Sequence, residues 1–194
     1  MKRFQKNIDS TNLLKIFHEC LLGLDRKEAL ECVAKLEEEM SGEESKVLLG
    51  TFRGLFLLPE DTVGASEQLG KVKVFLEGKR DIDSYIHSCY YRLGYSLYAA
   101  KKRFKQFYLT ALQFLAYTQP QEIEEGQKLG LLFEMAVAVL VSDQIYNFSE
   151  LLEQPMLATL RDSQHAWLYK LLEIFNRGDI NEFQKASLQH VVEG

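Results

Sequence analysis

The sequence predicts an all-α protein made of stacked antiparallel helix pairs, and three observations lead to this fold class. Apolar residues recur three and four positions apart along almost the whole chain, which is the spacing of one face of an α-helix. The 194 residues include only three prolines, whereas a β-sandwich or barrel needs frequent turn signals. Helix pairs are expected to begin near residues 12, 43 and 81, and spacings of this size are typical of helical-hairpin repeats.

The first helices are predicted on either side of Asp25. Asp25 stands in an N-cap position and Glu28 follows three residues later, so both side chains can bond backbone N–H groups that the helix leaves unpaired. Ser41 and Glu44 repeat this arrangement before the third helix, and Pro59 ends that helix. Each pair can bury its apolar faces only by stacking on the next pair.

The following helices continue the same pattern. A fourth helix is expected to end near Gly78, a fifth begins near Asp81, and a turn at 101–103 leads into a sixth. The period is loose and no repeat consensus is met. Residues 1–118 are therefore predicted to form a helical-repeat arm, a tetratricopeptide-like right-handed array.

Residues 119–194 are predicted to be helical as well, and continuous with this arm. One long helix is expected from Pro120 to about Ser142. Between 129 and 141 it is apolar on nearly all sides, so it should lie in the interior.

Shorter helices complete this part of the chain. Asn147 is expected to cap one of them, Pro155 to open another, and a helix around Trp167 to end at Gly178. A last helix is predicted from Asp179. Its apolar residues are Ile180, Phe183 and Val191.

Composition and charge exclude several classes of protein. With 46% hydrophobic residues and a net charge of −5, the chain is neither disordered nor a highly charged nucleic-acid tail. The longest apolar run contains Glu134 and is far shorter than the ~20 residues that cross a bilayer. The N-terminus lacks the apolar segment of a secretory signal, and the three cysteines form no C-x-x-C motif, so buried structural thiols are expected. These thiols are Cys20, Cys32 and Cys89.

A basic and aromatic segment, residues 85–117, is the one candidate for nucleic-acid binding. It contains ten Tyr and Phe residues, and no acidic residue lies between Asp83 and Glu122. Most of these aromatics fall on core positions of helices, and the basic residues lie where a helix ends, where they complement its dipole. No nucleic-acid partner is therefore expected. The basic residues are Arg92, Lys101, Lys102, Arg103 and Lys105.

No catalytic, cofactor or metal site is expected. His18 with Cys20, and His87 with Cys89, are two residues apart, so their side chains point to nearly opposite sides of a helix and cannot close on one ion. The chain has no glycine-rich phosphate loop, nucleophile elbow or zinc-protease motif. The protein is not expected to be an enzyme.

The most informative stretch runs from Ile145 to Pro155. Within it Phe148 is expected to pack back on the long helix, and Leu151 and Leu152 to continue the core. Here the sequence resembles a known family, the PCI-domain subunits of the 26S proteasome lid known as non-ATPase regulatory subunit 13. The matching residues lie between about 85 and 185, and further upstream only the helix pattern agrees. They include Tyr146, Asn147, Phe148, Glu150, Leu151, Leu152, Pro155, Trp167 and Gly178, with 107–115 upstream and Ser149 where the family usually has Gly.

The resemblance implies that residues 119–194 are the helical part of a PCI module, and the winged-helix half is expected to be absent from this chain. The implied role is a non-catalytic scaffold for neighbouring lid subunits, near the ubiquitin receptor, in ubiquitin-dependent degradation in the cytoplasm and nucleus. No cofactor and no membrane partner is expected, and the isolated chain should be a monomer.

Other functions stay open at this point. Sister complexes, such as the COP9 signalosome or a translation-initiation scaffold, use the same architecture. A stand-alone helical-repeat adaptor could bind a peptide in its concave face, and a PCI module could bind RNA through 92–105. The stretch from Tyr146 to Pro155 favours the lid subunit.

Overall fold

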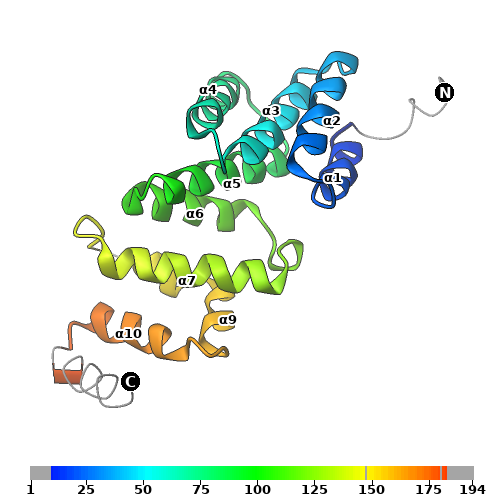
Figure 1. Cartoon of the computed structure of the whole chain (residues 1–194). Coiled ribbons are helices and arrows are strands. Elements are labelled where there is room, and N and C mark those ends of the chain that lie inside the picture. The colour runs from blue at the N-terminus through cyan, green and yellow to red at the C-terminus, as the bar shows by residue number, and fades with distance from the viewer. Residues whose placement is uncertain (1–9, 147, 180, 183–194) are drawn as a thin grey trace. The chain divides into compact units, whose positions relative to one another are not determined.

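A computed structural model describes residues 10–146, 148–179 and 181–182. Every regular element among these residues is helical, which confirms the all-α prediction (Figure 1). The chain divides into two compact units, Met1–Lys102 and Arg103–Gly194. The expected division between 118 and 119 into an arm and a helical PCI part stays a prediction.

The first unit is an array of antiparallel helices with α3 at its centre. α3 packs against all four other helices of the unit, and α4 also packs against α5. The row α1, α3, α5 is thus flanked by α2 and α4 (Figure 1). The five helices are α1 (Ser10–Leu21), α2 (Arg26–Glu39), α3 (Glu43–Leu57), α4 (Thr62–Gly78) and α5 (Ser84–Ala100).

Aspartate side chains begin three of these helices. Asp25 caps α2 as predicted, because its carboxylate accepts hydrogen bonds from the backbone N–H groups of Lys27 and Glu28 at 2.8 and 3.0 Å. Asp61 caps α4 in the same way. At α5 the cap is Asp83, so the helix begins three residues later than the predicted Asp81.

The predicted cap at Ser41 is wrong. α3 begins at Glu43, its N-cap residue is Gly42, and no side chain caps it. Ser41 lies one residue too far upstream to take that role. Two glutamates in the first turn of α3 favour the positive end of the helix dipole instead.

Leucine, alanine and aromatic residues fill the core of the first unit. One cluster joins the first three helices to α5, and a smaller one joins α4 to α5. Gly54 lets α3 approach α5 closely, because a Cβ atom there would lie 2.6 Å from Leu93 Cδ2. The larger cluster is Leu14, Leu21, Ala29, Val33, Leu48, Leu49, Phe52, Ile86 and Cys89.

The second unit is arranged around α7, which packs against α6, α9 and α10. Its α-helices are α6 (Phe104–Tyr117), α7 (Glu125–Val141), α8 (Ser149–Leu152), α9 (Ala158–Arg161) and α10 (Ala166–Arg177). Two short 3-10 turns, η1 (Pro120–Glu122) and η2 (Pro155–Leu157), connect them.

The long helix of this unit is shorter than predicted. Pro120 opens η1, and α7 begins only at Glu125. The Glu122 carboxylate accepts the backbone N–H of Gln119 at 2.8 Å, which closes the turn, and Ile123 is then extended. Of the predicted apolar stretch 129–141, six residues are buried, four are half-buried and three are exposed, and Val141 at the end of α7 is 61% exposed.

Candidate interaction surface

The predicted signature residues divide between the interior and the surface of the second unit. Phe148 and Leu151 are buried, as expected, and Leu152 is half-buried. The exposed members are Tyr146, Glu150, Pro155, Trp167 and Gly178, with Tyr146 89% exposed. Asn147, the expected helix cap, lies outside the described residues, as do Ile180, Phe183 and Val191 of the last predicted helix.

Side chains of α6 and α10 hold the signature stretch in place. The Tyr108 ring of α6 is buried, and burial together with the nearby Glu150 carboxylate raises its pKa to about 12. The Tyr108 hydroxyl lies near the Leu151 backbone N–H, which opposes this rise in pKa, but it forms no hydrogen bond of good geometry with the described residues. From α8, Ser149 Oγ donates to Asn176 Oδ1 of α10 at 3.5 Å.

Gly178 ends α10, as predicted. It adopts a left-handed conformation with a φ of 69°, which glycine reaches without steric cost. Its N–H donates to the Phe175 carbonyl at 3.1 Å, and the Asp179 N–H donates to the Ile174 carbonyl at 3.2 Å. This pair of bonds is a Schellman motif, so the role of Gly178 is to turn the chain.

The basic and aromatic segment 85–117 contributes mainly to the interior. Eight of its ten Tyr and Phe residues are buried or half-buried, which leaves few ring faces for stacking on bases. The exposed rings are those of Phe104 and Tyr117. The turn between α5 and α6 was predicted at this position, and it contains Lys101, Lys102 and Arg103.

A buried polar contact joins α1 to α5. The His18 ring stacks on Phe52 with centroids 4.4 Å apart, and His18 Nδ1 lies 3.1 Å from the Tyr85 hydroxyl. Burial, and then the Arg92 charge, lowers the pKa of His18 to about 4. Lys15 Nζ lies 4.7 Å from the centroid of the Tyr85 ring. His18 is therefore a neutral core residue at pH 7.

The cysteines differ in their surroundings. Cys89 is buried and Cys32 is half-buried, but Cys20 is exposed, so the prediction that it is buried is wrong. Cys20 lies on the side of α1 away from the core, whereas His18 faces inward. Within the described part of the chain, no group of three or more His, Cys, Asp and Glu could hold a metal ion.

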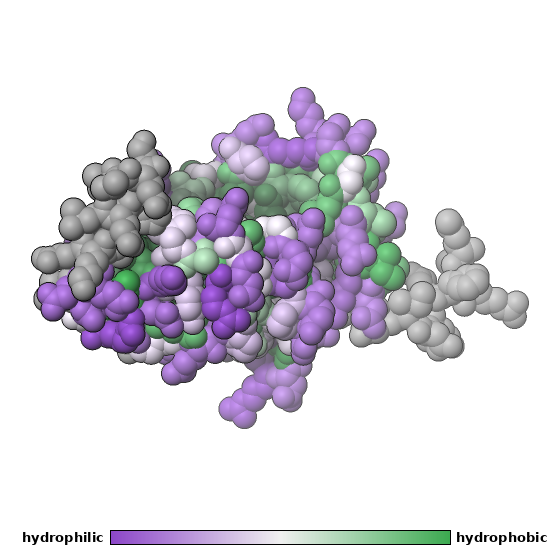
Figure 2. Space-filling model, turned by 90° about the horizontal axis from the view of Figure 1, so that it is seen from below, coloured by the Kyte–Doolittle hydropathy of each residue, from purple (hydrophilic) through white to green (hydrophobic). Residues whose placement is uncertain are grey.

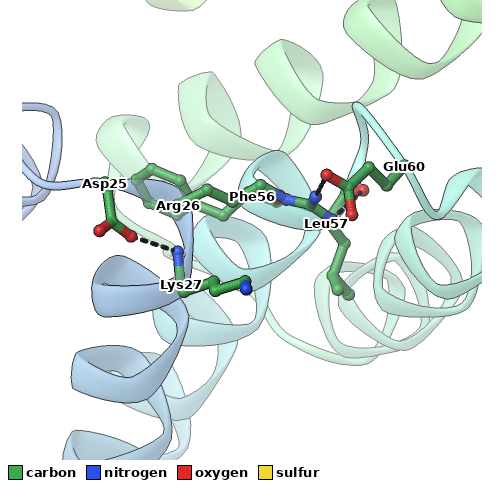
Figure 3. Close-up of polar contacts among 6 residues, drawn as sticks. All are labelled: Asp25, Arg26, Lys27, Phe56, Leu57 and Glu60. Atoms are coloured by element: carbon green, nitrogen blue, oxygen red, sulfur yellow. Dashed lines mark hydrogen bonds and ion pairs between the residues drawn. The ribbon is translucent and has the colours of Figure 1, made fainter.

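Arg26 joins the start of α2 to the end of α3 (Figure 3). Its Nε donates to the Phe56 carbonyl at 2.6 Å, its Nη2 donates to the Leu57 carbonyl at 3.4 Å, and its Nη1 forms an ion pair with Glu60. Both carbonyls lie in the last turn of α3, and the Leu57 carbonyl also accepts the backbone N–H groups of Glu60 and Asp61 at 3.1 and 2.8 Å. Sequence reasoning missed this contact, since the residues are thirty positions apart and form no motif.

Exposed apolar side chains gather on α1. Leu13 is 49% exposed and Ile16 60% exposed, and Cys20 follows on the same side of the helix. Figure 2 shows hydrophilic side chains over much of the surface, with hydrophobic side chains gathered in patches between them. The sequence itself indicates these exposed apolar residues. Apolar residues occur in adjacent pairs along 13–21, so they cover two sides of the helix. None of the described helices is both long and apolar enough to span a bilayer.

Stacked antiparallel helix pairs define an all-α helical-repeat protein. A family model described as PSD13 N-terminal repeats matches residues 1–172, and the chain belongs to this family. The match includes the first 84 residues, where the sequence alone showed only a helix pattern.

Curated relatives agree with this family. The chain is 32% identical to 26S proteasome non-ATPase regulatory subunit 13 homolog A of Arabidopsis thaliana over 190 residues, 92% of this chain and 49% of that protein. It is 34% identical to 26S proteasome non-ATPase regulatory subunit 13 of Dictyostelium discoideum over 134 residues, 66% of this chain and 35% of that protein. It is 32% identical to 26S proteasome regulatory subunit RPN9 of Saccharomyces cerevisiae over 130 residues, 66% of this chain and 33% of that protein. The chain thus spans a third to a half of the length of these relatives.

Proposed function

We propose that this chain is a non-catalytic structural component of the lid of the 26S proteasome regulatory particle, where it scaffolds neighbouring subunits for ubiquitin-dependent protein degradation. The observation that carries the proposal is the family match over 1–172, together with relatives that are named proteasome regulatory subunits. A stack of helix pairs suits this role, because it presents extended surfaces to partners.

Two segments of the chain have different roles in this function. Residues 1–118 serve as a helical-repeat arm, and residues 119–194 serve as the helical part of a PCI module. The partners are other lid subunits, with the ubiquitin receptor close by, and the site of action is the cytoplasm and nucleus. Free of these partners, the chain is a monomer and needs no cofactor.

Affinity purification tests this function. The chain, expressed in cells with an affinity tag, should recover subunits of the proteasome regulatory particle, identified by mass spectrometry, and the tag alone should recover none. Recovery of signalosome or translation-initiation subunits would assign the chain to a sister complex. Recovery without any proteasome subunit would reject the proposal.

A further inference from the structure

The turn between α5 and α6 carries four basic side chains within five consecutive residues. They are Lys101, Lys102, Arg103 and Lys105, and all four are exposed. None of them forms an ion pair with another side chain in the described part of the chain. No acidic residue lies between Asp83 and Glu122, although the whole chain has a net charge of −5. We call residues 101–105 the basic turn.

Two of the four cations oppose the local structure. Lys101 and Lys102 lie at the negative end of α5 and complement its dipole. Arg103, however, is the N-cap residue of α6, and Lys105 lies in the first turn of this helix, which contains no acidic residue. Cations at this positive end lower the stability of a helix, whereas Asp or Glu would raise it. Arg103 and Lys105 therefore do not serve the local fold, and residues that break a local rule are expected where a protein meets a ligand.

Two exposed apolar side chains accompany the basic turn. Phe104, within the turn, is 40% exposed. Leu109 is 50% exposed and follows Lys105 by four residues, so both lie on the same side of α6. The cations attract an anionic partner, and the apolar side chains favour one that also carries an apolar group. A single-stranded nucleic acid fits less well, because it stacks its bases on a row of exposed rings and the basic turn offers one.

We propose that an acidic segment of a partner protein, in which Asp or Glu residues flank a large apolar side chain, binds at the basic turn. The Arg103 guanidinium can donate two parallel hydrogen bonds to one carboxylate, and the lysines attract the others. The apolar side chain of the partner packs on Phe104 and Leu109. Exposed ion pairs are individually weak, so this contact is salt-sensitive. The inference does not depend on the complex to which the chain belongs.

The double variant Arg103→Glu, Lys105→Glu separates binding from folding. Its melting temperature should equal or exceed that of the wild type, because negative charges favour this end of α6. The probe is a fluorescent peptide in which glutamates flank a leucine, and its affinity, measured by anisotropy, should fall about tenfold in the variant. The matched control, Lys35→Glu, Lys71→Glu, makes the same change in net charge at exposed positions of α2 and α4 and should bind as the wild type does.

Three results of this binding experiment would overturn the inference. They are no binding of the peptide to the wild-type chain, equal binding to the wild type and the double variant, and an equal loss in the control variant. A fluorescent oligouridine is the second probe, and tighter binding of this RNA than of the peptide would assign the basic turn to a nucleic acid instead. The same peptide with glutamine in place of each glutamate should not bind, since the inference requires carboxylates.

A photo-crosslinking residue at position 106, an exposed position next to Lys105, identifies the partner in cells. Irradiation should join it to an Asp- and Glu-rich peptide of another protein, whereas the same group at position 63, where the side chain is 68% exposed, should not form that adduct. An adduct with RNA, with a second copy of this chain or with a peptide that lacks acidic residues would overturn the inference, as would no adduct. Recovery of proteasome subunits by the same tagged chain tests the proposed function separately, so either proposal can fail alone.

Discussion

Acidification should destabilise the first unit through His18. In the folded chain the pKa of His18 is lowered to about 4, whereas an exposed histidine has a pKa near 6.5. Between these values the unfolded chain binds a proton at His18 and the folded chain does not. Stability therefore falls as the pH falls from about 7 to about 4, because the unfolded state binds more protons.

The size of the effect follows from the two pKa values. Their difference corresponds to about 3 kcal/mol of unfolding free energy when titration is complete, and about 2 kcal/mol of this should already be lost at pH 5. The geometry gives the reason, since a charged imidazole would be held between the Phe52 ring and the Tyr85 hydroxyl with little access to water.

Urea unfolding at several pH values measures this effect. The comparison variant is His18→Gln, which keeps a polar side chain near Tyr85 but does not titrate. Burial also lowers the pKa of His87, and that contribution is present in both proteins and cancels. The stability advantage of the wild type over the variant should shrink by about 2 kcal/mol between pH 7.5 and pH 5. A constant advantage over this range, or an NMR titration of the His18 ring with a pKa of 6.5 or above, would refute the reasoning.

Three further variants test the packing by thermal or urea unfolding. Arg26→Ala should lower the free energy of unfolding by about 1 kcal/mol, because the Phe56 carbonyl loses its donor whereas the Leu57 carbonyl keeps the N–H groups of Glu60 and Asp61. Lys27→Ala on the exposed side should change it little, and equal losses would contradict this role of Arg26. Gly54→Ala should lower the free energy of unfolding by about 1 kcal/mol or more, because the new Cβ atom would lie 2.6 Å from a buried leucine. Its control is Gly70→Ala, which should raise the free energy of unfolding by roughly 0.5–1 kcal/mol, because the space around Gly70 is open. Tyr108→Phe should change the free energy of unfolding by less than about 1 kcal/mol, because the buried hydroxyl forms no hydrogen bond of good geometry; a larger loss would show that it accepts a strong bond from the nearby Leu151 N–H.

Helix content and pairing could be predicted from the sequence because both depend on local signals. Apolar spacing marks the faces, and a side chain such as Asp25 fixes a helix start through its own neighbours. Helix boundaries were predicted less well. Ser41 and Gly42 both precede α3, and the sequence pattern does not decide which adopts the extended backbone of an N-cap residue. At Pro120 the pattern predicts the start of the long helix, but only a short 3-10 turn closed by the Glu122 carboxylate begins there, and α7 begins at Glu125.

The burial of a side chain could be predicted only where the pattern of apolar residues also indicates a neighbouring helix that covers it. The position of Cys20 within an apolar helix indicates a core thiol, yet burial depends on whether another helix lies on that side. The contacts of His18 with Tyr85 and of Arg26 with Phe56 join positions 67 and 30 residues apart. Their residue types form no motif, so only the fold reveals them.

Two of the signature residues, Phe148 and Leu151, are recognisable in the sequence for a physical reason. Both are buried where a short helix follows α7, and a connection of defined geometry restricts the residues that can occupy it. Gly178 is restricted in another way, because the left-handed conformation that ends α10 favours glycine. Substitution of Phe148 should therefore reduce partner recovery only by unfolding the second unit, with a parallel loss of melting temperature. A loss of recovery at an unchanged melting temperature would show instead that Phe148 meets a partner itself.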